Sequence, residues 1–351
     1  LFRSVIHIVN QTYIIYKNCN VMIDVKKLQD HANNVLRILR DNKSEWEERY
    51  AKYADIFLSA SASSLQFRYP GELFAYLNFS TAQKNCTNKT TAKYFLRYQG
   101  QNVADIEVTK KDSKVTFTTY NTNDSNFEYS TNVKKADWRS NIGTQFRKFF
   151  ATYKKRIDNG RRNEEHRIQN LLFRELSKKI GIGKQLRYIQ PVKLQNCFFE
   201  MPTPFKASDH TPTYRGKNGG GVDILACVRH GNSTRLGVIE VKDETKPNEN
   251  IELVINQAVT YACFIRELLR SKSGDKWQEL FGYTKPITVP SSGLIIDAIA
   301  AMPNISEDDI KQLASTKRLR VAVEDDYLEL HCISFCENNN QLNILRHSWA
   351  R

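Results

Sequence analysis

The chain has 351 residues, of which 40% are apolar and 26% are charged, a balance typical of a folded globular protein that excludes an intrinsically disordered one. Its 52 basic and 38 acidic residues give a formal net charge of +14, which favours a polyanionic partner, nucleic acid first and a membrane surface second. No uninterrupted apolar run approaches the ~20 residues that a membrane-spanning helix needs, so we expect a cytoplasmic protein without a membrane segment.

The length predicts two domains, because a single hydrophobic core typically stops growing near ~250 to 300 residues. Apolar periodicity predicts helices over residues 22–66, with Asp24 as a cap, and period-two alternation from about residue 92 predicts a small antiparallel meander. A polar stretch over 121–134 is expected to be a loop. Residues 1–145 are therefore predicted to form an α+β domain, which could recognise DNA, bind a partner or regulate the other domain.

A basic segment over residues 141–167 is where we place the joint, so that the second domain covers 146–351. It carries eight Lys and Arg residues, namely Arg147, Lys148, Lys154, Lys155, Arg156, Arg161, Arg162 and Arg167. Such a run is either a solvated helix face or a surface that follows nucleic-acid phosphates. Aromatic side chains interrupt it at a spacing more often found in a stripe that faces a core.

Beyond the joint, the pattern alternates between helix and strand. An amphipathic helix is predicted to place Ile168, Leu171, Leu172, Leu176 and Ile180 on one face and to end before Gly181. Strands are expected near 187–200, 292–302 and 319–346, and a helix over 249–271. This order predicts an α/β fold with a mixed central sheet flanked by helices.

The seven cysteines are scattered and form no CxxC pair, which argues against a disulfide framework and a zinc ribbon. His331, Cys332 and Cys336 lie close together, but within YLELHCISFCE, whose alternation is typical of a strand. We therefore expect these cysteines to be structural.

Two β-rich runs, VDILACVR and TRLGVIEVK, are separated by HGNS, and Gly-Asn at 231–232 is a two-residue hairpin signal. With this pair at the centre of the turn, facing residues have numbers that sum to 463, which places Asp223 opposite Glu240. Because side chains alternate along a strand, Lys242 is expected on the same face as Glu240, while the residues on either side of Glu240 point into the core.

Two facing carboxylates repel, and structure alone gives no reason for them unless a cation lies between them. Oxygen ligands of this kind suit Mg²⁺ or Mn²⁺. The alternative is a purely structural ion pair, in which Asp223 or Glu240 pairs with Lys242 at the end of a strand.

Asp223 followed by Glu240-Val241-Lys242 resembles the PD-(D/E)XK nuclease superfamily, which includes many restriction endonucleases. The resemblance covers roughly residues 160–300. A glutamate on the preceding helix is part of this pattern, and Glu165 supplies it, with Glu164 as the alternative. Gln257 and Tyr261 resemble the Gln-x-x-x-Tyr pair on the helix after the lysine strand, and an i, i+4 spacing keeps both on one face. In one departure, Val222 stands where the superfamily has proline.

The resemblance implies a restriction endonuclease-like fold and a Mg²⁺- or Mn²⁺-dependent endonuclease acting on DNA. The metal-binding residues it implies are Asp223, Glu240, Val241 through its carbonyl, and Glu165, which would orient a water or hold a second ion. Lys242 would position the nucleophile or stabilise developing charge. Gln257 and Tyr261 would steady the lysine or contact the DNA backbone.

Gly219 to Gly221 resemble a phosphate-binding loop only superficially, because no GK[S/T] follows; we expect a flexible segment leading into the strand.

Three other functions stay open at this level. The protein could be a nuclease fold that has lost cleavage and binds nucleic acid, a nuclease directed to RNA, or an interaction protein whose charge serves solubility. The complete Asp-Glu-Lys set argues against the first, because a degraded site usually loses one member. The favoured function is a DNA endonuclease of a restriction, defence or DNA-processing type, by analogy alone. Since cutting both strands often requires two active sites, a homodimer is a reasonable expectation.

Overall fold

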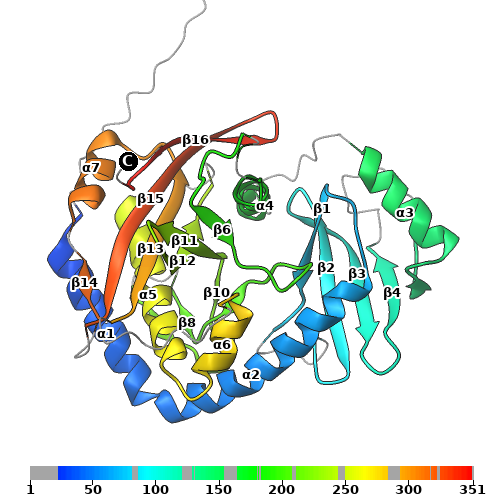
Figure 1. Ribbon diagram of the computed structural model, residues 1–351, viewed down its shortest axis with the longest axis horizontal. Helices are drawn as coiled ribbons and strands as arrows, with labels where there is room; N and C mark the ends of the chain where they lie inside the picture. Colours follow the sequence, from blue (N-terminus) through cyan, green and yellow to red (C-terminus); the bar gives the residue numbers. More distant parts are fainter. Residues whose placement is uncertain are drawn as a thin grey trace, which may run out of the picture.

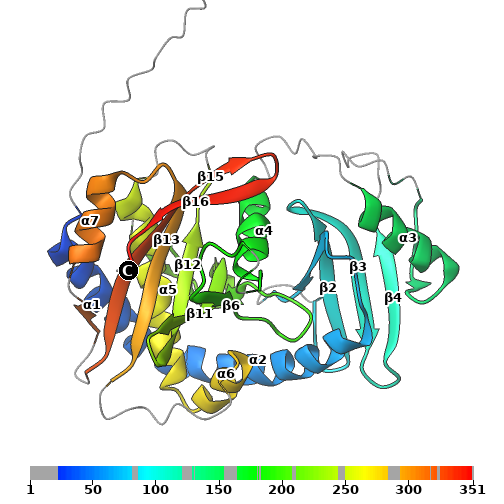
Figure 2. The ribbon, with the colours of Figure 1, turned by 45° about the horizontal axis from the view of Figure 1, so that its top comes forward.

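The computed structural model describes residues 23–80, 86–120, 129, 131–153, 164–179, 181, 183–207, 211–243, 250–283, 293–316, 318–321 and 325–349. Within them, two large sheets lie side by side and helices join and cover them, as Figure 1 and Figure 2 both show. None of the described helices has the length and apolar character needed to span a bilayer.

Two helices open the described chain, α1 (Val25–Asp41) and α2 (Lys43–Ser63). As predicted, Asp24 caps α1: its Oδ1 accepts the backbone N–H of Lys26 at 3.0 Å. The single predicted helical region is divided at Asn42, whose side-chain amide donates to the Ile38 carbonyl at 2.8 Å. A 3₁₀ turn (Ser64–Gln66) ends this part of the chain.

The first sheet has five antiparallel strands in chain order. They are β1 (Leu73–Leu77), β2 (Thr91–Tyr98), β3 (Gln101–Thr109), β4 (Lys114–Thr119) and β5 (Ala136–Asp137). The predicted meander corresponds to β2, β3 and β4. Strand β1 was not predicted, and all five of its residues are buried, so it lacks the alternation that marks a half-exposed strand.

Helix α3 (Asn141–Thr152) packs on this first sheet. The Phe146 ring lies 5.4 Å from that of Phe117 on β4 and 5.9 Å from that of Trp138, so the aromatic stripe faces the core, as its spacing indicated. Of the basic segment, Arg147 donates to the Trp138 carbonyl and Lys148 is exposed. Its residues 154–163, with most of the predicted basic surface, lie outside the described residues.

The second sheet is mixed, which confirms the predicted α/β class. Its strand order is β14-β15-β13-β12-β11-β6, with β16 also paired to β15. The strands are β6 (Ile189–Pro191), β11 (Ile224–His230), β12 (Ser233–Val241), β13 (Ile295–Pro303), β14 (Leu319–Arg320), β15 (Tyr327–Asn338) and β16 (Gln341–His347). Strands β12, β13 and β15 are parallel, and the other pairings are antiparallel.

Both faces of this sheet are covered. Helix α5 (Ile251–Leu269) packs on the face that carries Val238 and Ala298, and helix α4 (Glu164–Leu176) packs on the opposite face with Ile239 and Ile299. Four of the five predicted apolar residues of α4 are buried; the fifth, Ile180, lies beyond the helix and outside the described residues.

Helix α4 stands between the two sheets (Figure 1). On one side its Phe173 ring lies 5.9 Å from Tyr76 of β1 and 4.3 Å from Phe198. The mixed sheet lies on its other side, so α4 is in contact with both.

Short elements complete the described fold. They are β7 (Met201–Pro202) paired with β10 (Gly221–Val222), β8 (Phe205–Lys206) paired with β9 (Thr213–Tyr214), a 3₁₀ turn (Gly216–Asn218), and the helices α6 (Gly274–Leu280) and α7 (Glu307–Ser315). Neither α6 nor α7 was predicted, since helices of 7 and 9 residues leave little periodicity to detect.

The predicted division at residue 145 stays a prediction. That position falls inside α3, and α1, from the first part of the sequence, packs on α5 of the second: His31 Nε2 lies 2.8 Å from Thr260 Oγ1. Apolar residues of both sheets also belong to one contiguous core.

Candidate active site

The hairpin has the predicted register. Ile224 faces Ile239 and His230 faces Ser233, so paired residue numbers sum to 463 throughout. Asp223 lies just before the ladder, at a bend between β10 and β11, and its Oδ2 accepts the backbone N–H of Val241 at 2.8 Å. This hydrogen bond holds the Asp223 carboxylate at the end of β12, beside Glu240.

Lys242 is at the centre of the charged residues. Its Nζ donates to Glu240 Oε1 at 2.8 Å, and both side chains are 6% exposed. The same Nζ lies 3.8 Å from Glu165 Oε1 on α4. The ammonium group therefore joins the helix glutamate to the strand that carries Glu240.

The structure distinguishes between the two candidate glutamates of α4. Glu164 accepts from Nε of Arg167 at 2.9 and 3.0 Å, and Arg167 also contacts Glu337 of β15 at 3.3 Å. Glu164 is therefore engaged away from Lys242, whereas Glu165 faces it. This arrangement supports Glu165 as the site residue.

Tyr261 on α5 reaches the same region. A Cβ added at Gly220 would lie 2.8 Å from the Tyr261 hydroxyl, so the glycine permits this close approach. The glycine segment is not a flexible lead-in: Gly220 donates to the Phe205 carbonyl at 2.6 Å and accepts from Thr203 N–H at 2.8 Å. Gln257, one helical turn before Tyr261, is 7% exposed and makes no hydrogen bond to Lys242 in the described part of the chain.

The pKa shifts reflect this crowding of charge. Burial and the neighbouring Glu240 raise the pKa of Asp223 well above its ordinary value. Burial alone would lower the pKa of Lys242, but Glu240, Asp223 and Glu165 together raise it. Burial, Glu240 and Asp223 raise the pKa of Tyr261, because its hydroxyl lies within the field of both carboxylates.

The donor set fits a divalent cation. Three carboxylates, those of Glu165, Asp223 and Glu240, surround a single ammonium group, so the fully ionised cluster carries a net charge of −2. Oxygen ligands with this charge suit Mg²⁺ or Mn²⁺. No described contact bears on the Val241 carbonyl, and the ligand roles of all four predicted residues stay predictions.

Sequence reasoning missed Gln169. Its side chain is 1% exposed, and its Nε2 donates to the Asp223 carbonyl at 2.7 Å, which ties α4 to the bend that presents Asp223. A signal was present, because Gln169 lies four residues after Glu165 and therefore on the same face of the helix. Sequence reasoning also missed Asp243, a buried acid directly after Lys242 that is 5% exposed.

The first sheet also borders the site. Arg97 of β2 donates to Glu200 Oε1 at 2.8 Å, and its guanidinium lies 4.1 Å from the ring centre of Tyr76. Desolvation and the nearby Arg97 lower the pKa of His166, the neighbour of Glu165. Arg97 of the meander thus lies close to the helix that carries Glu165, which spacing along the sequence could not show.

Comparison with protein-family models, with curated proteins and with solved structures gives no match for this chain.

Proposed function

We propose that this protein is a Mg²⁺-dependent endonuclease with a restriction endonuclease-like fold, which hydrolyses phosphodiester bonds of DNA. The observation that carries the proposal is the convergence of Glu165, Asp223, Glu240 and Lys242 at the end of β12. Glu165 on α4 stands 58 positions before Asp223 and 77 before Lys242 in the sequence. A structural ion pair needs one carboxylate for one ammonium, whereas here three carboxylates act on the Lys242 ammonium, which leaves an excess of negative charge that a cation would balance.

Each residue of the site would have a separate role in the reaction. Asp223 and Glu240 would hold the ion, which when bound would acidify a water and offset charge on the phosphate. Lys242, kept protonated by its carboxylate neighbours, would donate to a phosphate oxygen and stabilise the charge that develops there. Glu165 would orient the attacking water, and Tyr261 would fix the position of the lysine.

The substrate assignment rests on charge. The net charge of +14 favours a polyanion, and a phosphodiester backbone presents the group on which this set of residues acts. A homodimer would bring two such sites to the two strands of a duplex. The same chemistry allows RNA, which is an outcome of the experiment below.

The test is cleavage of supercoiled plasmid, single-stranded DNA and RNA with Mg²⁺, Mn²⁺ or EDTA. Wild-type protein is expected to cut DNA only with metal, and Glu240→Ala or Lys242→Ala to lose at least about 10²-fold in rate while remaining folded, as loss of a charge-stabilising group does. Glu165→Gln is expected to lose activity, whereas Glu164→Gln, one residue away on the same helix, is the matched control that keeps it.

Each other result has a defined meaning. Undiminished cleavage by Glu240→Ala would refute the site. Metal-dependent cleavage of RNA alone would assign an RNA nuclease, and salt-sensitive binding without cleavage would assign a silent nucleic-acid-binding protein.

A further inference from the structure

A second cluster of metal-ligating side chains lies on the other face of the mixed sheet. His230, Asp297, Glu329 and His331 each offer one ligand atom, and these atoms all lie within 4.8 Å of one another. They come from β11, β13 and β15, so they belong to three different strands. Asp297 pairs with Gly237 of β12, on the face opposite Glu240, which separates this cluster from the proposed nuclease site.

Two buried atoms of the cluster face each other without a hydrogen bond. Asp297 is 0% exposed and His331 is 7% exposed. Oδ1 of Asp297 and Nε2 of His331 lie 3.8 Å apart, and neither has a hydrogen-bond partner in the described part of the chain. Buried polar atoms in this state are rare in folded proteins and require an explanation such as an ion.

A contact to the other ring nitrogen, Nδ1, orients His331. Ser348 Oγ lies 3.3 Å from Nδ1 of His331 and accepts the N–H of Cys332 at 2.9 Å. With Nδ1 donating to this oxygen, Nε2 carries a lone pair that faces the Asp297 carboxylate. A hydrogen bond on the far nitrogen is what fixes the tautomer and ring orientation of metal-binding histidines.

The remaining residues complete the geometry. His230 Nε2 lies 2.7 Å from Oδ2 of Asp297, so both histidines meet one carboxylate. Glu329 is held by Arg235 and, at 3.5 Å, by Arg318. Arg235 lies 3.7 Å from Oδ1 of Asp297, too far for a hydrogen bond, so it does not satisfy that atom.

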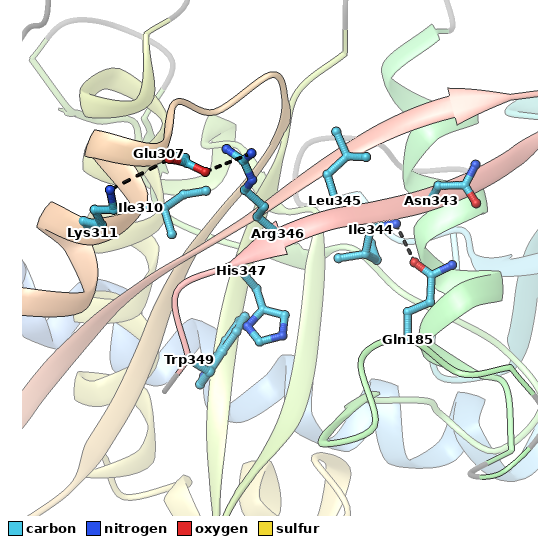
Figure 3. Close-up of a pocket in the computed structure, with 10 residues that line it drawn as sticks. All are labelled: Gln185, Glu307, Ile310, Lys311, Asn343, Ile344, Leu345, Arg346, His347 and Trp349. Atoms are coloured by element: carbon cyan, nitrogen blue, oxygen red, sulfur yellow. Dashed lines mark hydrogen bonds and ion pairs between the residues drawn. The ribbon is translucent and has the colours of Figure 1, made fainter. Parts of the chain in front are cut away.

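The cluster adjoins a pocket at the carboxyl end of the described chain. The Trp349 ring stacks on that of His331, with centres 4.5 Å apart and planes at 13°. Trp349 and His347 also line a pocket of about 630 Å³ between β16 and α7, where Figure 3 shows them next to each other. One side of the His331 ring is thus covered by an aromatic residue that itself borders solvent.

We propose that His230, Asp297 and His331 bind a Zn²⁺ ion, with Glu329 beside the fourth position. Two imidazoles and a carboxylate are a donor set that zinc prefers, whereas Mg²⁺ prefers oxygen. Ligands of a tetrahedral zinc lie roughly 3.3 Å from one another, so the 3.8 Å gap between Asp297 and His331 needs only a small contraction. The ion would join three strands of the sheet, independently of whether the protein is a nuclease.

The test uses the full chain, stripped with a chelator, dialysed against Zn²⁺ in the presence of excess Mg²⁺, and assayed for bound zinc per chain by mass spectrometry. One equivalent is expected in wild-type protein, with a rise in Tm on binding. The bound zinc should be lost in His331→Gln and in His230→Ala. The His230 side chain is 21% exposed, so its replacement is compatible with folding. Circular dichroism checks that both variants are folded.

Two controls locate the ion. Both control variants are expected to keep one equivalent of bound zinc. They are Cys336→Ser, on the same strand as His331, and Glu240→Ala, in the proposed nuclease site. Co²⁺ should bind in place of zinc with the visible absorption of a tetrahedral centre, absent from His230→Ala. The proposal is overturned if wild-type protein binds no zinc, if both folded histidine variants retain it, or if either control loses it.

Discussion

At the scale of single residues, Asp223 is held in a position that is unfavourable to its charged form. Burial and Glu240 raise its pKa in the folded protein. A carboxyl group with a raised pKa contributes stability that is fully present below its unfolded pKa of about 3.9 and is lost as pH rises toward the folded value. Without metal, Asp223 is thus expected to destabilise the protein at neutral pH.

Asp223→Asn is accordingly expected to raise the stability of the metal-free protein at pH 7, because the amide cannot acquire the charge that burial and Glu240 disfavour. The gain should be absent near pH 4 and grow as pH rises, as urea unfolding in EDTA would show. Mg²⁺ should then raise the Tm of the wild type more than that of the variant. Equal stability of the two proteins at pH 4 and pH 7 would contradict this account.

The contact between Gly220 and Tyr261 gives a second prediction at this scale. Because a Cβ at Gly220 would lie 2.8 Å from the tyrosine hydroxyl, Gly220→Ala should destabilise the protein, and Tyr261→Phe should relieve part of that loss. Urea unfolding of the two single variants and the double variant would give a coupling energy of about 1 kcal/mol. If the stability changes of Gly220→Ala and Tyr261→Phe are strictly additive, the Tyr261 hydroxyl is not the reason that position 220 needs glycine.

Much of the candidate site was predictable from residue spacing. A turn at 231–232 fixes which residues face each other, so the proximity of Asp223 and Glu240 followed from counting. The choice between Glu164 and Glu165 could not be made by counting, because it depends on the contact of Arg167 with Glu337 on a distant strand. The cluster around His331 was not predicted either, since its members come from three strands that only tertiary structure brings together.

At the scale of elements, β12 depends on a glycine in its interior. A Cβ at Gly237 would lie 2.7 Å from Val228 Cγ2 and 3.0 Å from Ile299 Cδ1, side chains of the two flanking strands. Gly237→Ala is therefore expected to cost about 1 to 3 kcal/mol, the usual penalty for overpacking a core.

Urea unfolding would measure this cost, with Gly71→Ala as the matched control, because a Cβ at Gly71 would meet nothing within 4 Å. The control should change stability by less than about 0.5 kcal/mol, as surface substitutions usually do. An equal effect of the two substitutions would mean that β12 does not need its glycine for packing.

Elements with a clear period were predicted best. Helix α4 and the meander carry an amphipathic or alternating pattern that the local sequence displays, and the hairpin carries a Gly-Asn turn signal. Strand β1 is buried on both faces and α6 is a single short helix against α2, so neither shows a pattern of its own. Tertiary packing, which the local sequence does not encode in its periodicity, determines such elements.

At the scale of the whole molecule, the charge of +14 predicts salt-dependent binding of DNA. If about six phosphates are contacted, affinity should fall by roughly 10³-fold between 50 and 200 mM salt, because the bound phosphates release their counterions. Fluorescence anisotropy with Glu240→Ala in EDTA would measure this without cleavage. A slope near zero would mean that the charge serves solubility instead.

The packing of α1 on α5 also bears on how the chain is made. His31 contacts Thr260 across 229 positions of the sequence, and the apolar face of α1 is buried against elements of the second sheet. At about 5 to 20 residues per second, a ribosome needs roughly 10 to 50 s to make the intervening chain. For that time the first described helix lacks its native contacts with α5, so this fold can be completed only after most of the chain has been synthesised.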